Sequence, residues 1–143
     1  MTSASSILSL AICAGLSQSA YAADVKAANA SKGEILVLLS SENVMQLADG
    51  KTEPTGYYLN EFGVPAKALV DAGYKLVLAT PKGNAPSVDK KSVIPQYVDG
   101  GASQMRDTQT FVASIEGIDD TLSLSEVIGQ GLEEFEGVFV PGG

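Results

Sequence analysis

Histidine is absent from this 143-residue sequence, and cysteine occurs only once, at Cys13. These absences exclude several kinds of catalytic site. A Ser-His-Asp triad, a Cys-His pair and a zinc site with histidine or cysteine ligands cannot be assembled from this chain alone, because each needs residue types that the chain lacks. If the protein uses such chemistry, the missing groups have to come from elsewhere.

Basic side chains are also scarce. Nine Lys and Arg residues stand against 17 Asp and Glu residues, which gives a formal net charge of -8. The field of such a protein repels phosphate backbones, and no basic cluster overrides it, so the sequence argues against a nucleic-acid partner. The rest of the composition, 45% hydrophobic and 18% charged, is that of an ordinary globular protein of about one domain.

Charged side chains are missing from the first 22 positions, where Ile7 to Leu16 forms a mostly apolar run. A run of this length is too short to span a bilayer, which needs roughly 20 residues. It is followed by Ala20-Tyr21-Ala22, the small-x-small pattern that a signal peptidase reads. We therefore predict a cleavable signal peptide that ends at Ala22; a buried N-terminal helix is the alternative.

This interpretation divides the chain into a signal peptide over 1–22, a linker over 23–33 and a folded segment over 34–143. Cleavage removes Cys13, so the mature chain has no thiol and no disulfide can stabilise it. We expect a secreted or periplasmic protein that has no membrane contact after cleavage.

The folded segment has the apolar runs of a parallel α/β sheet. The continuous run Ile35 to Leu39 predicts a strand buried on both faces, and Tyr74 to Ala79 and Glu136 to Val140 predict two more buried strands. A parallel sheet seldom ends at its third strand, because it needs further strands and helices to cover it. We therefore expect the N-terminal part of a larger domain, with a partly uncovered apolar edge at the last strand.

The segments between these strands predict one long loop and several helices. Residues 40–56 are polar and rich in turn formers, which is typical of a loop. A short turn is expected around Glu61 and a helix over Pro65 to Ala72, because proline is best placed in the first turn of a helix. Ser103 is expected to cap a further helix, and Ser123 to Glu126 matches a capping box before a short one.

Five motifs along the folded segment occur in a recognisable order. They are Thr55-Gly56-Tyr57-Tyr58-Leu59-Asn60-Glu61 with Pro65, Asp71-Ala72-Gly73-Tyr74, Pro81-Lys82-Gly83, Val88-Asp89, and Val138-Phe139-Val140-Pro141-Gly142-Gly143. In this order the chain resembles the ThiJ/PfpI superfamily, in particular its glutathione-independent glyoxalase III-like branch of stress proteins. The resemblance covers Glu34 to Gly143. It implies a flavodoxin-like, class I glutamine amidotransferase-like α/β sandwich, of which the N-terminal part is present.

The resemblance also implies a site. Glu61 is the catalytic carboxyl group, placed in family members beside a nucleophilic Cys and a His. Gly142 and Gly143 form the floor that binds substrate, where a backbone N–H faces the oxyanion and only glycine permits so close an approach. The implied reaction converts methylglyoxal, a small aldehyde, to lactate without an external cofactor or a metal: the thiolate adds to the carbonyl group and the carboxyl group transfers protons. The Cys and the His lie beyond the Pro-Gly-Gly in family members, so we expect the printed chain to be inactive.

Other interpretations stay open. From the residues alone, Glu61 is a surface carboxylate at a helix start, and Pro141-Gly142-Gly143 is a turn after a strand. A non-catalytic holdase-like or ligand-binding member, or an amidotransferase- or peptidase-like branch, would keep the same fold. A homodimer is the remaining partner to consider. The carboxylates Asp119 and Asp120 fit no calcium loop, so we expect them to be solvated.

Overall fold

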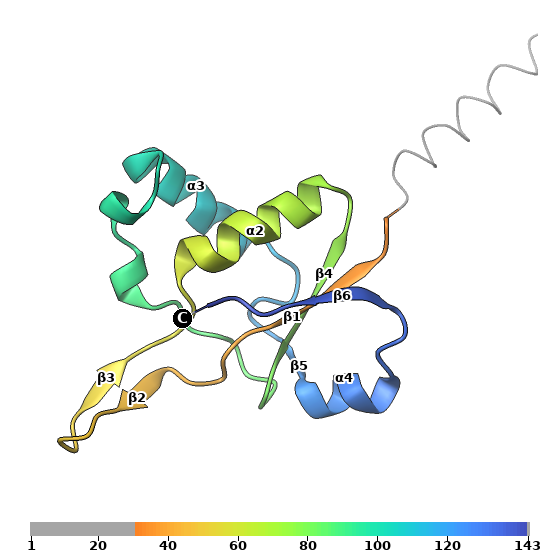
Figure 1. Cartoon of the computed structure of the whole chain (residues 1–143), viewed down its shortest axis with the longest axis horizontal. Coiled ribbons are helices and arrows are strands. Elements are labelled where there is room, and N and C mark those ends of the chain that lie inside the picture. The colour runs from red at the N-terminus through yellow and green to blue at the C-terminus, as the bar shows by residue number, and fades with distance from the viewer. Residues whose placement is uncertain (1–30, 143) are drawn as a thin grey trace, which may run out of the picture. The chain divides into compact units, whose positions relative to one another are not determined.

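Strand β1 (Glu34–Leu38) lies inside a four-stranded sheet of order β5-β4-β1-β6. The computed structural model describes residues 31–142, and within them β1 pairs in parallel with β4 (Lys75–Thr80) on one side and with β6 (Phe135–Phe139) on the other (Figure 1). The short strand β5 (Leu122–Ser123) extends β4, also in parallel. All three predicted strands are thus present and parallel; β5 was not predicted, because two residues carry no periodicity.

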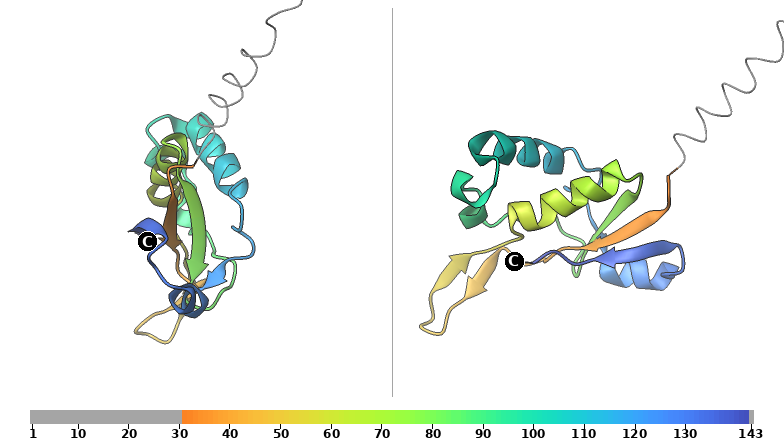
Figure 2. Two further views of the ribbon diagram at one scale, coloured as in Figure 1. Left: turned by 90° about the vertical axis from the view of Figure 1, so that its right-hand side faces the viewer. Right: turned by 45° about the horizontal axis from the view of Figure 1, so that its top comes forward.

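Helices cover both faces of this sheet. Helices α2 (Leu59–Asp71) and α3 (Gly101–Ala113) pack on one face, and α4 (Leu124–Gln130) packs on the other (Figure 2). Two short 3₁₀ helices, η1 (Lys90–Ser92) and η2 (Pro95–Tyr97), lie between β4 and α3. Among the described residues, no helix is both long enough and apolar enough to cross a membrane.

The apolar run of β1 is explained by these two layers. Side chains alternate across a strand, so Ile35 and Val37 pack with Phe62 of α2, whereas Leu36 packs with Val127 of α4. All five side chains are buried. A strand with helices on both sides has no polar face, and this confirms the prediction of a doubly buried strand.

The expected loop over 40–56 is wrong in part, because it contains a β-hairpin. Strands β2 (Val44–Gln46) and β3 (Thr52–Pro54) pair antiparallel, with Gly50 in the left-handed region of the turn at a φ of 77°. The hairpin projects from the sheet (Figure 1). Its side chains are mostly exposed, so no alternation of apolar and polar residues signals it in the sequence.

Helix α2 begins at Leu59 rather than at the predicted Pro65, and no separate turn forms around Glu61. Pro65 lies inside the helix, where it has no N–H to donate to the carbonyl oxygen of Glu61 one turn earlier. The residues before it compensate for this loss, because Leu59 and Phe62 are buried in the core. Tertiary burial therefore outweighs the local preference of proline for a helix start.

The predicted cap is wrong for the next helix, α3, and confirmed for α4. Helix α3 begins at Gly101, with Gly100 as its N-cap, so Ser103 is not the cap. Helix α4 has the predicted capping box: the Ser123 side chain accepts from the Glu126 N–H, and the Glu126 carboxylate accepts from the Ser123 N–H.

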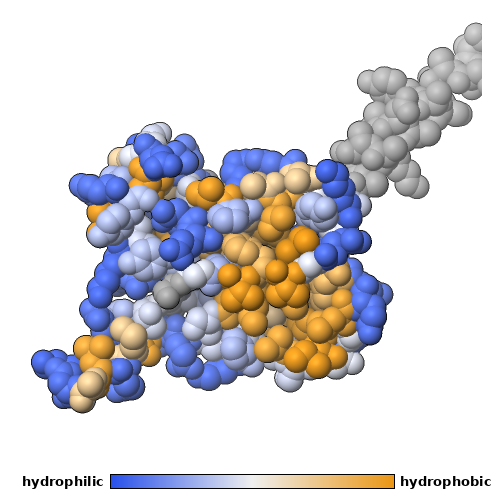
Figure 3. Space-filling view, viewed as in Figure 1, coloured by the Kyte–Doolittle hydropathy of each residue, from blue (hydrophilic) through white to orange (hydrophobic). Residues whose placement is uncertain are grey.

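Strand β6 is the edge of the sheet and is less buried than predicted. Val138 and the following Val140 are 59% and 64% exposed. Figure 3 shows apolar surface gathered over this part of the molecule. The expected uncovered apolar edge is therefore present. The predicted signal peptide, Cys13 and Gly143 lie outside the described residues.

Candidate functional site

A cavity of about 390 Å³ lies where β1, β4 and β6 end. Ligands of open parallel sheets bind at the carboxyl ends of the strands, so this edge is where a site is expected. The lining residues follow the three strands or precede α2: Leu38, Leu39, Ser40, Thr55, Gly56, Tyr57, Pro81, Val140, Pro141 and Gly142.

Glu61 lies next to this cavity, against Gly142. It is the third residue of α2 and is exposed. A Cβ atom built on Gly142 would overlap the carboxylate Oε2 of Glu61. Glycine leaves room for the carboxylate in this position through its missing side chain rather than through a left-handed backbone. The structure thus brings together two of the three predicted site residues, whereas Gly143 lies outside the described residues.

The first turn of α2 is held by a segment that lies about thirty residues further along the chain. The N–H of Leu59, which has no partner within the helix, donates to Ser92 Oγ at 2.9 Å. Ser92 is fully buried, and its own hydroxyl donates to the Asp89 carbonyl at 2.6 Å. The Asn60 amide donates to the Tyr97 carbonyl at 2.7 Å. These contacts fix the turn that carries Glu61.

Gly56 explains the glycine of the Thr55-Gly56-Tyr57 motif. A Cβ atom built on it would overlap the backbone oxygen of Ser87. The two segments form a parallel bridge, in which the Tyr57 N–H donates to the Ser87 carbonyl and the Asp89 N–H donates to the Tyr57 carbonyl, each at 2.9 Å. The motif therefore docks the residues before α2 on the segment after β4.

The loop after β4 is tied to the loop after β1. Lys82 donates its backbone N–H to Ser41 Oγ at 2.8 Å and pairs with the Glu42 carboxylate at 2.6 Å. Asn84 donates its amide to the Ser41 carbonyl at 3.1 Å. Ser40 and Pro81, which line the cavity, lie at the roots of these two loops, so the contacts hold its rim.

Tyr57 stands between the cavity and the core. Its ring packs edge-on against Phe62, with ring centroids 5.1 Å apart. Burial, and after it the charge of Asp119, raises the pKa of the Tyr57 phenol. The hydroxyl is therefore protonated at neutral pH and able to donate a hydrogen bond.

Glu61 is a group that can exchange protons, and the described residues place no thiol beside it. A carboxyl group beside an open glycine backbone can take up or release a proton on a bound molecule. Residues 31–142 contain neither Cys nor His. Within the same range, no group of three or more acidic, histidine or cysteine side chains is arranged to hold a metal ion.

Sequence reasoning missed the residues that support the site. Ser92 and Asn60 act through contacts with distant parts of the chain, and Ser92 lies in a short polar stretch with no pattern of its own. One local signal could have indicated them. The residue before α2 is Tyr58, whose side chain caps no helical N–H, so the cap has to come from another part of the chain.

Solved structures of other proteins share this fold. The chain is similar to rapid encystment protein 24 kDa of Francisella tularensis, with a TM-score of 0.58 and 19% identity over 77% of this chain and 44% of that one. It is also similar to glyoxalase III of Candida albicans, with a TM-score of 0.50 and 24% identity over 66% of this chain and 38% of that one.

The structural likeness confirms the predicted flavodoxin-like α/β fold. The chain spans less than half the length of either solved protein. No protein-family model and no curated protein sequence matches it.

Proposed function

We propose that this chain is the N-terminal part of a ThiJ/PfpI-type protein and that the intact protein is a glutathione-independent glyoxalase. The observation that carries the proposal is the contact of the Glu61 carboxylate with Gly142 at the carboxyl edge of the sheet. Two motifs far apart in the sequence meet there, beside a cavity of about 390 Å³ that can hold a small aldehyde. The shared fold of Candida albicans glyoxalase III supports the proposal.

In this proposal Glu61 transfers protons. A cysteine thiolate and a histidine, supplied by residues beyond Gly143, complete the site, since the printed chain has no histidine and its single cysteine is Cys13. The thiolate adds to the aldehyde carbon of methylglyoxal to give a hemithioacetal. Glu61 takes up the proton of that carbon and returns it to the neighbouring carbon, which leaves a thioester of lactate. A water molecule then hydrolyses the thioester, which releases lactate and restores the thiol. The backbone after Pro141 faces the substrate oxygen, because no side chain at Gly142 blocks it.

The proposal is tested with the full-length protein. We expect it to convert methylglyoxal to lactate without glutathione, and Glu61→Gln to lower kcat by at least about 100-fold, the usual contribution of a general acid–base group. Glutamine keeps the shape of glutamate but cannot exchange a proton, so the change separates chemistry from packing. Lactate formed over time is the measurement.

Glu116→Gln is the matched control, because Glu116 is an exposed residue just after α3 and lines no part of the cavity. We expect it to retain the activity of the wild type. Equal rates for wild type and Glu61→Gln would return Glu61 to a surface carboxylate. A full-length protein with no turnover at all would favour the non-catalytic, ligand-binding alternative.

A further inference from the structure

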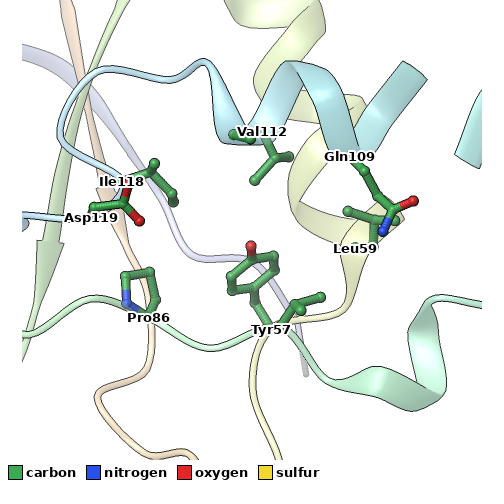
Figure 4. Close-up of a pocket in the computed structure, with 9 residues that line it drawn as sticks. Tyr57, Leu59, Pro86, Gln109, Val112, Ile118 and Asp119 are labelled. Carbon is green, nitrogen blue, oxygen red and sulfur yellow. The ribbon is translucent and has the colours of Figure 1, made fainter. Parts of the chain in front are cut away.

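A second cavity, of about 270 Å³, lies on the side of Tyr57 that faces α3. Figure 4 shows its side chains, which come from α3, the start of α2, and the segments after β4 and before β5. They are Tyr57, Leu59, Pro86, Val88, Gln109, Val112, Ala113, Ile118 and Asp119. Glu61 and Gly142 are not among them, so the proposed function leaves this cavity without a role.

The wall of this cavity is mostly apolar, with three polar side chains. In Figure 4 the Tyr57 ring rises into the space between Asp119 and Gln109, with its hydroxyl toward Val112. Asp119 is close enough to Tyr57 that its charge contributes to the raised pKa of the phenol. The cavity thus combines one carboxylate, one phenol and one amide with aliphatic walls.

The charge of the cavity is uncompensated by the protein. None of the lining residues is Lys or Arg. Within residues 31–142, the ion pairs involve other carboxylates, those of Glu42, Asp49, Glu53 and Asp71. The hydrogen bonds of the described residues likewise leave the Tyr57 hydroxyl and the Asp119 carboxylate without a protein partner. Asp119 is exposed, so its charge is open to a ligand, and a carboxylate beside an apolar wall attracts a cation more strongly than a neutral molecule.

We propose that this cavity binds a small organic ammonium ion with an apolar body. The ammonium group donates to the Asp119 carboxylate, on the side of the cavity where the charge of Asp119 reaches the Tyr57 phenol. The apolar body then packs on Pro86, Val88 and Ile118. The volume is just below the usual range for drug-sized ligands, roughly 300–1,000 Å³, which restricts the ligand to a single ring or a short chain.

The overall charge favours the same class of ligand. At a net charge of -8 the molecule attracts cations and repels carboxylates and phosphates. The face of the Tyr57 ring adds a further attraction for an ammonium group that lies over it. Small carboxylates of the same size are therefore expected to bind much more weakly.

Benzylammonium is a suitable probe, and the full-length protein is titrated with it while amide chemical shifts are followed by NMR. We expect saturable binding with shifts at Tyr57, Gln109 and Asp119. Benzyl alcohol has the same body without the charge and is expected to bind at least about tenfold more weakly, since charge-assisted hydrogen bonds are roughly twice as strong as neutral ones.

Asp119→Asn is the decisive variant, and Asp120→Asn is its matched control. The two residues are neighbours and both are exposed, but only Asp119 lines the cavity. We expect Asp119→Asn to weaken benzylammonium binding by about tenfold or more and Asp120→Asn to leave it nearly unchanged. Tyr57→Phe, which removes only the hydroxyl, is expected to weaken it by less.

Three results would overturn the proposal: no saturable binding by the wild type, equal binding of benzyl alcohol, or equal loss in the two Asp variants. Unchanged thermal unfolding of each variant verifies that the fold is intact. The test is independent of glyoxalase activity, because it measures binding rather than turnover and none of the variants changes Glu61.

Discussion

Single residues in this protein act by allowing two segments of chain to meet. Gly142 admits the Glu61 carboxylate, and Gly56 admits the backbone of the segment that follows β4. The sequence motifs contain both glycines, but the motif alone does not say what approaches them. The partner of Gly142 could be expected only from the family resemblance, because periodicity and spacing give no contact between residues so far apart. Nothing in the sequence indicates that the backbone of Ser87 lies against Gly56.

Gly56→Ala should destabilise the protein by about 1 to 3 kcal/mol, because a new methyl group would displace backbone rather than a flexible side chain. Gly129→Ala is the control: Gly129 lies in α4 with nothing within 4 Å of the added Cβ atom. This change should leave stability unchanged or raise it by up to about 1 kcal/mol. Urea unfolding measures both, and equal effects would contradict the close approach at Gly56.

At the scale of elements, sequence patterns predicted the buried strands and the local helix cap. They missed elements that depend on contacts between residues far apart in the sequence. The run of β1 and the capping box of α4 are local signals, and both are confirmed. The start of α2 was misplaced by six residues, from Leu59 to Pro65, because its first turn is stabilised by Ser92 and by core burial. The hairpin of β2 and β3 was missed because exposed strands need no apolar alternation.

The capping box of α4 should make stability depend on pH. The Ser123 hydroxyl, and after it the Ser123 N–H, lowers the pKa of Glu126 from its ordinary value of 4.5. A lowered pKa in the folded state means that the stabilisation is complete above pH 4.5 and is lost as the pH falls through the folded pKa. Ser123→Ala removes the hydroxyl, which is the larger of the two causes.

Unfolding free energies of wild type and Ser123→Ala, measured from neutral pH down to acid, test this expectation. The difference between the two should be constant above pH 4.5 and should shrink below it. Other carboxylates titrate equally in both proteins and cancel in the difference. A difference that stayed constant throughout would show that the Glu126 carboxylate gains nothing from the cap.

At the scale of the whole molecule, the sheet has helices on both faces, but the edge strand β6 is only partly covered. Strand β6 pairs only with β1 among the described residues, and Val138 is 59% exposed. An edge strand with apolar side chains is able to pair with another chain. Natural proteins protect such edges with further elements or with charged side chains, and on β6 the only charged side chain is Glu136, two residues before Val138.

The 143-residue chain should therefore self-associate and show no turnover of methylglyoxal. Val138→Lys should shift it toward the monomer, because an edge lysine opposes strand pairing. Val70→Lys places the same charge at an exposed position of helix α2 and should have no such effect. Size-exclusion chromatography with an activity assay is the measurement. A sharp wild-type monomer peak would contradict the first expectation, and genuine turnover would contradict the cysteine-dependent mechanism.

The cap that Ser92 provides for α2 has a consequence for the order of folding. A cap from a neighbouring residue is at hand as soon as a helix forms, but the first turn of α2 gains its missing partner only when residues 87–97 have docked. Because these contacts join the start of the helix, the Tyr57 bridge and η1, we expect the three to assemble and open together. Glu61 belongs to that unit, so its carboxyl group reaches its place only after long-range contacts form, and a local loosening of the segment after β4 would release it.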